Sequence, residues 1–254
     1  MLAVRDLAVR FGGVAALGGV TFEVAPGTIT ALIGPNGAGK TTAFNAITGY
    51  LRPSRGQVLY EGAALTGLRP CEIARRGVVR TFQKTSVFPA LSVLDNVLTG
   101  LHLRGAAGFW SILAGRRRVR DEEARLRTEA EEIIALVGLP HRRHEVASGL
   151  PYGEQRLVEL AVALAARPAL LLLDEPAAGM TGTEKDTVSG LIKRIRGQGV
   201  TVLLVEHDMR LVMGISDTII VLNHGAVIAE GPPAEIQAHP DVIRAYLGTG
   251  GGRD

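Results

Sequence analysis

The chain has 254 residues, of which 46% are hydrophobic and 21% are charged, and 28 basic residues against 25 acidic ones leave a formal net charge of +3. This composition is typical of a globular protein with a full core, and it excludes a disordered chain. In the arginine-rich stretch "GRRRVRDEEARLR" the basic residues are interleaved with acids, so the sequence predicts no nucleic-acid partner.

Cys71 is the only cysteine, which fits a reducing compartment because neither an intrachain disulfide nor a cysteine metal cluster can form. Charges at positions 5, 6 and 10 argue against a signal peptide, and no stretch approaches the roughly 18 apolar residues of a membrane span. We therefore expect a cytosolic protein that serves a membrane, if at all, from outside the bilayer. Each motif described below occurs once, which predicts one domain over residues 1–254.

The first two thirds of the chain predict short β-strands followed by helices. The strands, separated by turn residues such as Pro26-Gly27, are expected at residues 3–9, 20–24, 29–33, 57–60 and 78–82. The helices are expected at residues 41–48, 118–137 and 154–166, and Gly49 is in a position that suits the C-cap of the first.

The last third changes to an alternation of strands and helices. "ALLLLD" (169–174) and "VTVLLVEHD" (200–208) are continuous apolar runs that end in acids, as expected of strands covered on both faces. The helical stretch 183–196 separates them, which predicts an α/β fold with a mostly parallel sheet and crossover helices. Two strands within residues 217–231 and a helix over residues 241–247 complete the prediction.

A glycine-rich loop follows the strand predicted at residues 29–33 and leads into a predicted helix. It satisfies the pattern G-x-x-x-x-G-K-[ST] of phosphate-binding loops. Without bulky side chains its backbone N–H groups can converge on phosphate oxygens at the helix N-terminus, while Lys40 adds a full positive charge and the Thr41 hydroxyl can ligate Mg²⁺. The predicted ATP-binding residues are Gly34, Pro35, Asn36, Gly37, Ala38, Gly39, Lys40, Thr41 and Thr42.

Two acids end the buried strand predicted at residues 169–174. Asp174 is placed to hold the metal, and Glu175 to orient or deprotonate the attacking water. A pair of acids after a strand can instead mark an ordinary helix N-terminus, but the phosphate-binding loop upstream favours a nucleoside triphosphate site with Asp174 and Thr41 as metal ligands.

Four further motifs, "RTFQ", "LPYGEQR", "LLLLDEP" and "VEHD", follow the loop in the order and approximate spacing of the ATP-binding cassette (ABC) transporter ATPases. The chain resembles this family over essentially its whole length. The resemblance implies a P-loop NTPase core at about residues 1–85 and 165–254, with an N-terminal antiparallel β subdomain and an inserted α-helical subdomain at about residues 86–164. It also implies ATP and Mg²⁺ as cofactors.

The resemblance implies partners and a location as well. Family members work with transmembrane permease subunits and pair with a second ATPase subunit, identical or different, so we expect a peripheral protein at the cytoplasmic face of the inner membrane. An uptake system would connect the chain indirectly to a solute-binding protein.

Individual roles carry over by position. Gln83 resembles the family's glutamine, which contacts Mg²⁺ or water, and His207 resembles the switch histidine, a hydrogen-bond donor to the γ-phosphate. Phe11 lies where the family stacks an aromatic ring on adenine, which is a sequence-tolerant contact. The alternatives are a structural histidine and an ordinary edge-strand aromatic.

Residues 150–155 resemble the family's signature. In the family, the glycine of the signature begins a helix that faces the γ-phosphate bound to the partner subunit. The signature's members here are Leu150, Pro151, Tyr152, Gly153, Glu154 and Gln155. The family usually has Leu-Ser-Gly-Gly-Gln, so Pro151 removes a hydroxyl donor. Thr181 similarly replaces an aspartate that many cassettes carry.

These departures, together with three further segments, resemble the sequences of one subfamily. "DEPAAGM", "EHDMRLVMGISD" and the ending "HPDVIRAYLG" are similar to cassettes that energise uptake of branched-chain amino acids, with close relatives for amides or urea. We expect the ending to lie far from the nucleotide chemistry. The alternatives are a lipid or lipopolysaccharide export cassette, a soluble ABC ATPase without a transport role, and a regulator that binds nucleotide without hydrolysis.

Residues 84–110 follow Gln83 and are rich in apolar side chains. We expect part of this stretch to form a groove for a helix of the membrane partner, although an ordinary packed helical region is an equal alternative. The apolar residues are Val87, Phe88, Leu91, Val93 and Trp110. His141 and His144 are expected in a solvated loop rather than at a metal.

Overall fold

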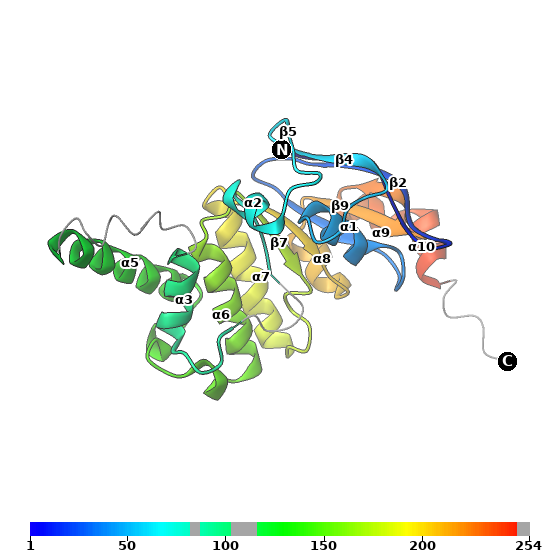
Figure 1. The fold of residues 1–254 in the computed structure, drawn as a ribbon. Helices are drawn as coiled ribbons and strands as arrows, with labels where there is room; N and C mark the ends of the chain where they lie inside the picture. Colours follow the sequence, from blue (N-terminus) through cyan, green and yellow to red (C-terminus); the bar gives the residue numbers. More distant parts are fainter. Residues whose placement is uncertain (82–86, 103–115, 248–254) are drawn as a thin grey trace.

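The computed structural model describes residues 1–81, 87–102 and 116–247, which form two sheets and surrounding helices (Figure 1). The four-stranded antiparallel sheet has the order β2 (Val14–Val24), β1 (Leu2–Phe11), β4 (Arg55–Tyr60), β5 (Ala63–Ala64). The six-stranded sheet has the order β10 (Ala226–Gly231), β9 (Thr218–Asn223), β3 (Ile29–Ile33), β8 (Thr201–Val205), β7 (Leu170–Asp174), β6 (Val78–Arg80). Its strands are parallel except for β10, as the apolar runs predicted.

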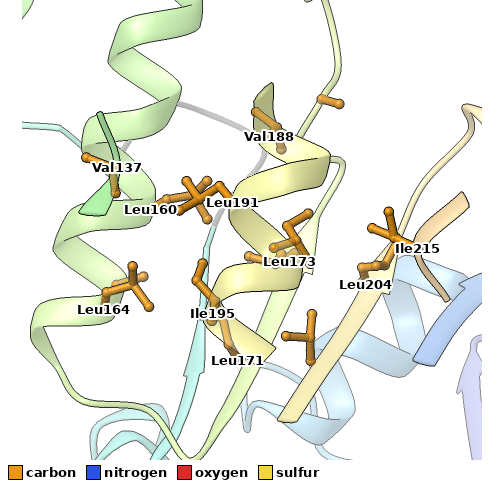
Figure 2. Close-up of a cluster of buried hydrophobic side chains, with 14 of the residues drawn as sticks. Val137, Leu160, Leu164, Leu171, Leu173, Val188, Leu191, Ile195, Leu204 and Ile215 are labelled. Carbon is orange, nitrogen blue, oxygen red and sulfur yellow. The ribbon is translucent and has the colours of Figure 1, made fainter. Parts of the chain in front are cut away.

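The continuous apolar strands arise because the six-stranded sheet is covered on both faces. In β7, Leu171 and Leu173 pack on the helical side, where Figure 2 shows them beside Leu191 and Ile195 of α7 (Gly182–Gly197). Leu170 and Leu172 belong to the opposite core, shared with the four-stranded sheet. Successive side chains of a strand point to opposite faces, so a strand between two cores needs apolar residues at every position.

Helices cover the two faces unequally. On the face toward the four-stranded sheet lie α1 (Lys40–Ile47) and α2 (Pro70–Arg75). The other core includes residues from α3 (Val93–His102), α5 (Arg116–Leu136), α6 (Tyr152–Ala165), α7, α8 (Met209–Ile215), α9 (Pro233–Ala238) and α10 (Pro240–Leu247). Helices α3, α5 and α6 pack against one another and project to one side of the sheets (Figure 1).

The fold predicted from the resemblance is confirmed, and most boundaries differ by two residues or fewer. The strand predicted at 20–24 begins earlier, at Val14, because residues 14–19 are rich in alanine and glycine, which are depleted in strands. Four helices were not predicted as such. Helices α2, α8 and α9 each offer less than two turns of periodicity, and α3 lies within residues 84–110, for which a packed helical region was one of two alternatives. Within the described residues, no helix has the length and apolar character needed to span a bilayer.

Candidate nucleotide-binding and catalytic site

The glycine-rich loop joins β3 to α1, and its glycines are required by close backbone contacts. Gly34 has φ +150°, and a Cβ there would lie 2.1 Å from the Leu222 carbonyl oxygen. Gly39 is the N-cap of α1, and a Cβ there would lie 2.7 Å from the Ala16 carbonyl oxygen. No side chain caps α1, so its first N–H groups remain open toward the loop. The loop is a backbone cradle at a helix N-terminus, as an anion site requires.

Lys40 supplies the positive charge of this cradle. The residue is 6% exposed, and its Nζ donates to the carbonyl oxygens of Gly34 at 2.6 Å and Pro35 at 2.9 Å. Burial lowers the pKa of the Lys40 ammonium, and the nearby Glu175 carboxylate opposes that shift. Thr41, in the first turn of α1, is exposed and available to a ligand.

Asp174 ends β7 and lies 1% exposed at the same edge of the sheet. Its Oδ2 accepts from the Arg80 guanidinium at 2.7 Å in a buried ion pair. Its Oδ1 is buried and has no hydrogen-bond partner among the described residues. Arg80 also donates to Asn45 Oδ1 at 2.6 Å and Thr48 Oγ1 at 3.3 Å, so it ties β6 and β7 to the loop's helix.

Glu175 and His207 meet beside Asp174. Strands β7 and β8 are parallel neighbours, so their carboxyl ends bring the two side chains together. His207 Nε2 lies 3.2 Å from Glu175 Oε1. The Glu175 side chain is 25% exposed and the His207 side chain 47% exposed, so both remain accessible to water. This pair was predicted to act at the same site, and the geometry places them in contact.

Of the two remaining predicted site residues outside the signature, the structure describes Phe11 but not Gln83. Phe11 ends β1 with 54% of its surface exposed, so its ring is available for stacking rather than packed in a core. Gln83 lies outside the described residues.

The signature residues begin α6. This helix starts at Tyr152, two residues earlier than predicted, so Gly153 lies in its first turn rather than before it. Pro151 is the N-cap and no side chain caps the helix, but Gly153 is buried in the first turn, and a Cβ there would lie 2.3 Å from the Glu184 carboxylate oxygen Oε1. Glu154 would place a negative charge there, but its carboxylate pairs with Arg142 at 3.0 Å.

The rest of the signature has structural partners. Leu150 is buried, and its carbonyl oxygen accepts from Gln155 Nε2 at 2.9 Å. The hydroxyl oxygen of the half-exposed Tyr152 accepts from Arg156 Nε at 3.1 Å, and its ring lies against Gly179.

The residues present fit a nucleoside triphosphate with Mg²⁺. The cradle offers backbone N–H groups and a lysine for phosphate oxygens. The buried Asp174 Oδ1 without a hydrogen-bond partner and the exposed Thr41 hydroxyl are oxygen donors of the kind Mg²⁺ prefers.

The C-terminal helix is closer to this site than expected. Burial raises the pKa of the Tyr246 phenol in α10, and a hydrogen bond from the Gly34 backbone opposes the shift. The expectation that the chain's ending lies far from the nucleotide site was therefore wrong. Helical periodicity predicted α10, but no sequence pattern shows which loop a helix reaches.

Two residues near the site were missed as functional candidates. Arg80 and Glu206 lay inside the quoted motifs "RTFQ" and "VEHD" without a role. A charged residue at the end of a buried strand was the available signal, since such a side chain is rarely buried without a partner.

Comparison with known proteins agrees with the geometry. The family described as "ABC transporter" matches residues 17–178, and that described as "Branched-chain amino acid ATP-binding cassette transporter" matches residues 226–251. The high-affinity branched-chain amino acid transport ATP-binding protein LivG of Escherichia coli K12 is 43% identical over 98% of both chains.

Solved structures are similar over nearly the whole chain. MJ1267, an ATP-binding cassette of an ABC transporter, in its ADP conformation, has a TM-score of 0.85 and 31% identity and covers 98% of both chains. MJ0796, a bacterial ABC transporter cassette with a dimeric structure, has a TM-score of 0.77 and 25% identity, with 92% of this chain and 99% of that chain covered.

The fold, with its cradle after β3 and acids after β7, is that of a P-loop nucleoside triphosphatase. More narrowly, the chain belongs to the ABC transporter family and is an ATP-binding subunit with ATPase activity.

Proposed function

We propose that this chain powers a membrane importer of branched-chain amino acids or of related amides or urea. The observation that carries the proposal is the 43% identity to LivG over 98% of both chains. The match of residues 226–251 to a branched-chain amino acid cassette family supports it, because that segment lies outside the general ABC transporter match.

In this proposal residues 34–42 bind the triphosphate of ATP. Lys40 exchanges the carbonyl oxygens of Gly34 and Pro35 for phosphate oxygens, which removes the cost of its buried charge. Mg²⁺ supplies charge neutralisation at the phosphates when bound. Thr41, Asp174 and Gln83 hold it, and the ring of Phe11 stacks on adenine.

Glu175 orients or deprotonates the attacking water, and His207 donates a hydrogen bond to the γ-phosphate. Their 3.2 Å contact supports this pairing, because each side chain then fixes the orientation of the other. Gln83 completes the catalytic set from the segment beyond Arg80.

The proposal places a second ATPase subunit, identical or different, across the nucleotide. The first turn of α6 faces the partner's γ-phosphate, and residues 150–155 form the contact once the Glu184 carboxylate, which packs against the buried Gly153 in the single chain, moves aside. The pairing of Glu154 with Arg142 supports this arrangement, because it offsets one of the negative charges near the first turn of α6.

Nucleotide-driven closing of the two subunits moves the membrane permease subunits. We place the chain at the cytoplasmic face of the inner membrane, with a solute-binding protein as an indirect partner. The nucleotide-binding core comprises about residues 1–85 and 165–254, and the helical subdomain comprises about residues 86–164. The mutual packing of α3, α5 and α6 supports this division.

Catalysis is tested with Glu175→Gln. We expect this variant to bind ATP with unchanged affinity, to hydrolyse it about 10²-fold more slowly or worse, and to accumulate an ATP-bound dimer. Phosphate release and sedimentation in the presence of ATP measure both effects. Asp186→Asn, an exposed acid of α7, is the control. Unchanged turnover in Glu175→Gln would remove Glu175 from its role.

The transported substrate is tested in the assembled complex. The chain is co-purified with its native permease subunits, and ATPase stimulation is measured with branched-chain amino acids, amides and urea, each with the solute-binding protein. Stimulation by one of these classes supports import of that class. Stimulation by lipid alone, without the solute-binding protein, would contradict import and favour an export cassette.

A further inference from the structure

Glu206 is an acid buried beside the catalytic pair. It follows the last residue of β8, is 4% exposed, and takes part in no ion pair within the described part of the chain. Backbone N–H groups donate to both of its oxygens, and the Lys185 ammonium lies within electrostatic range of it. Oε1 accepts from the Ala177 N–H at 2.8 Å, while Oε2 accepts from the N–H groups of His207 at 2.9 Å and Asp208 at 3.3 Å. Each oxygen therefore serves a different segment.

The Ala177 segment carries Glu175, whose backbone is strained. Glu175 has φ +50°, a left-handed conformation that costs a residue with a side chain about 1–3 kcal/mol and needs support from its surroundings. The Glu175 N–H donates to the Val205 carbonyl oxygen at 2.9 Å, and two residues later Ala177 donates to Glu206. Val205 and Glu206 at the end of β8 thus accept hydrogen bonds from the first and third residues of the Glu175–Ala177 segment.

We infer that Glu206 is a positioning residue for ATP hydrolysis: its carboxylate ties the Glu175 turn to the His207 segment and sets the contact between those two side chains. The inference rests on the roles proposed above for Glu175 and His207. Glu206 acts through the backbone and touches neither water nor phosphate itself.

Substitution by glutamine breaks this arrangement with little change in volume. The amide retains only one acceptor oxygen and presents an NH₂ group where the other oxygen accepted an N–H. Either the Ala177 N–H or the N–H groups of His207 and Asp208 therefore lose their acceptor and lie against the NH₂ group of the glutamine instead. Aspartate keeps the charge, but its carboxylate is one methylene shorter and cannot reach both segments.

The test is a double-mutant cycle in the full-length protein. Turnover and ATP affinity are measured for Glu206→Gln, His207→Ala and the double variant, using release of labelled phosphate so that slow rates are measurable. Glu122→Gln, an exposed acid of α5, is the control. We expect Glu206→Gln to lower kcat at least about tenfold relative to wild type, with an ATP affinity within about threefold of wild type. We expect the kcat of the double variant to be less than about threefold below that of His207→Ala.

Equal tenfold losses in both backgrounds would overturn the inference, because a purely structural residue gives additive effects. So would a kcat of Glu206→Gln within threefold of wild type while Glu175→Gln and His207→Ala are inactive. If instead Glu175→Gln and His207→Ala turn over normally, the proposed function fails, and this outcome is distinct from the others.

Should Glu206→Gln fail to fold, the same cycle is run with Glu206→Asp. Independently of any variant, hydrogen exchange of the wild-type Ala177 amide reports the tie directly. Slow exchange, comparable to that of the β8 amides, supports the inference, and exchange as fast as in an exposed loop overturns it.

Discussion

At the scale of single residues, the Arg80–Asp174 ion pair sets the charge balance of the site. The two side chains are 7% and 0% exposed, so each needs the other as a counter-charge. Arg80→Met removes one partner and leaves Asp174 charged and buried, which costs about 3–5 kcal/mol of folding free energy. Urea unfolding of Arg80→Met measures this loss.

The double variant Arg80→Met/Asp174→Leu is the matched control, because replacing both charges by apolar groups removes the penalty. It should recover most of the stability lost in Arg80→Met, although it lacks the carboxylate that we propose as a Mg²⁺ ligand. A loss below about 1 kcal/mol in Arg80→Met would show that Arg80 does not balance the Asp174 charge.

Some residues of the candidate site could be predicted from the sequence and others could not. The cradle and Asp174-Glu175 could be predicted because phosphate and metal chemistry dictates their residue types and their order after buried strands. The partners of Arg80 and Glu206 could not be predicted, since they lie 94 and 29 residues away and no local pattern encodes such pairs. Gln83 stays a prediction.

At the scale of elements, α8 depends on one capping acid. Asp208 is its N-cap and accepts from the N–H groups of Arg210 and Leu211, while Lys185 donates to its other oxygen at 2.7 Å. The hydrogen bond from Lys185, followed by those backbone groups, lowers the pKa of Asp208 below its ordinary 3.8. A lowered carboxyl pKa stabilises the fold above that ordinary value, and the contribution is lost as pH falls through the folded pKa.

Asp208→Ala should therefore cost about 1 kcal/mol of folding free energy at pH 7. The difference from wild type should shrink as the pH falls below 3.8. Chemical unfolding at several pH values measures the effect, with the exposed acid Asp186→Ala as control. A difference that is constant down to low pH would contradict an ionised cap.

The loop before α3 presents Phe88 to solvent on a rigid support. Phe88 is 55% exposed, yet its backbone N–H donates to Asn96 Oδ1 at 2.7 Å and its carbonyl oxygen accepts from Asn96 Nδ2 at 3.1 Å. Asn96 itself is fully buried. A fixed, exposed aromatic suits a docking contact, as predicted for the groove; of its other residues, Val93 is buried and Trp110 lies outside the described residues.

Phe88→Glu should leave the ATPase activity of the isolated chain within about twofold of wild type, because a surface substitution scarcely alters folding. Substrate-dependent stimulation in the complex should be lost. Ile243→Glu, an exposed apolar residue of α10, is the control and should keep coupling. Loss of basal ATP hydrolysis in Phe88→Glu would contradict the docking role.

At the scale of the whole molecule, the parallel sheet could be predicted because buried strands need apolar residues on both faces, as in β7 and β8. The antiparallel sheet followed from the resemblance, whereas the early start of β2 did not. The approach of α10 to Gly34 could not be foreseen, because long-range packing of a short helix leaves no periodic signal. This contact joins the segment that marks the subfamily to the cradle shared by the whole family.

In the proposed function, Lys40 and the backbone cradle hold the triphosphate of ATP. Equilibrium binding of Mg-ATP to wild type, Lys40→Ala and the exposed-lysine control Lys193→Ala tests this directly. A lost hydrogen bond from a charged group predicts about tenfold to a hundredfold weaker binding in Lys40→Ala alone. Equal Mg-ATP affinity in all three proteins would contradict the account.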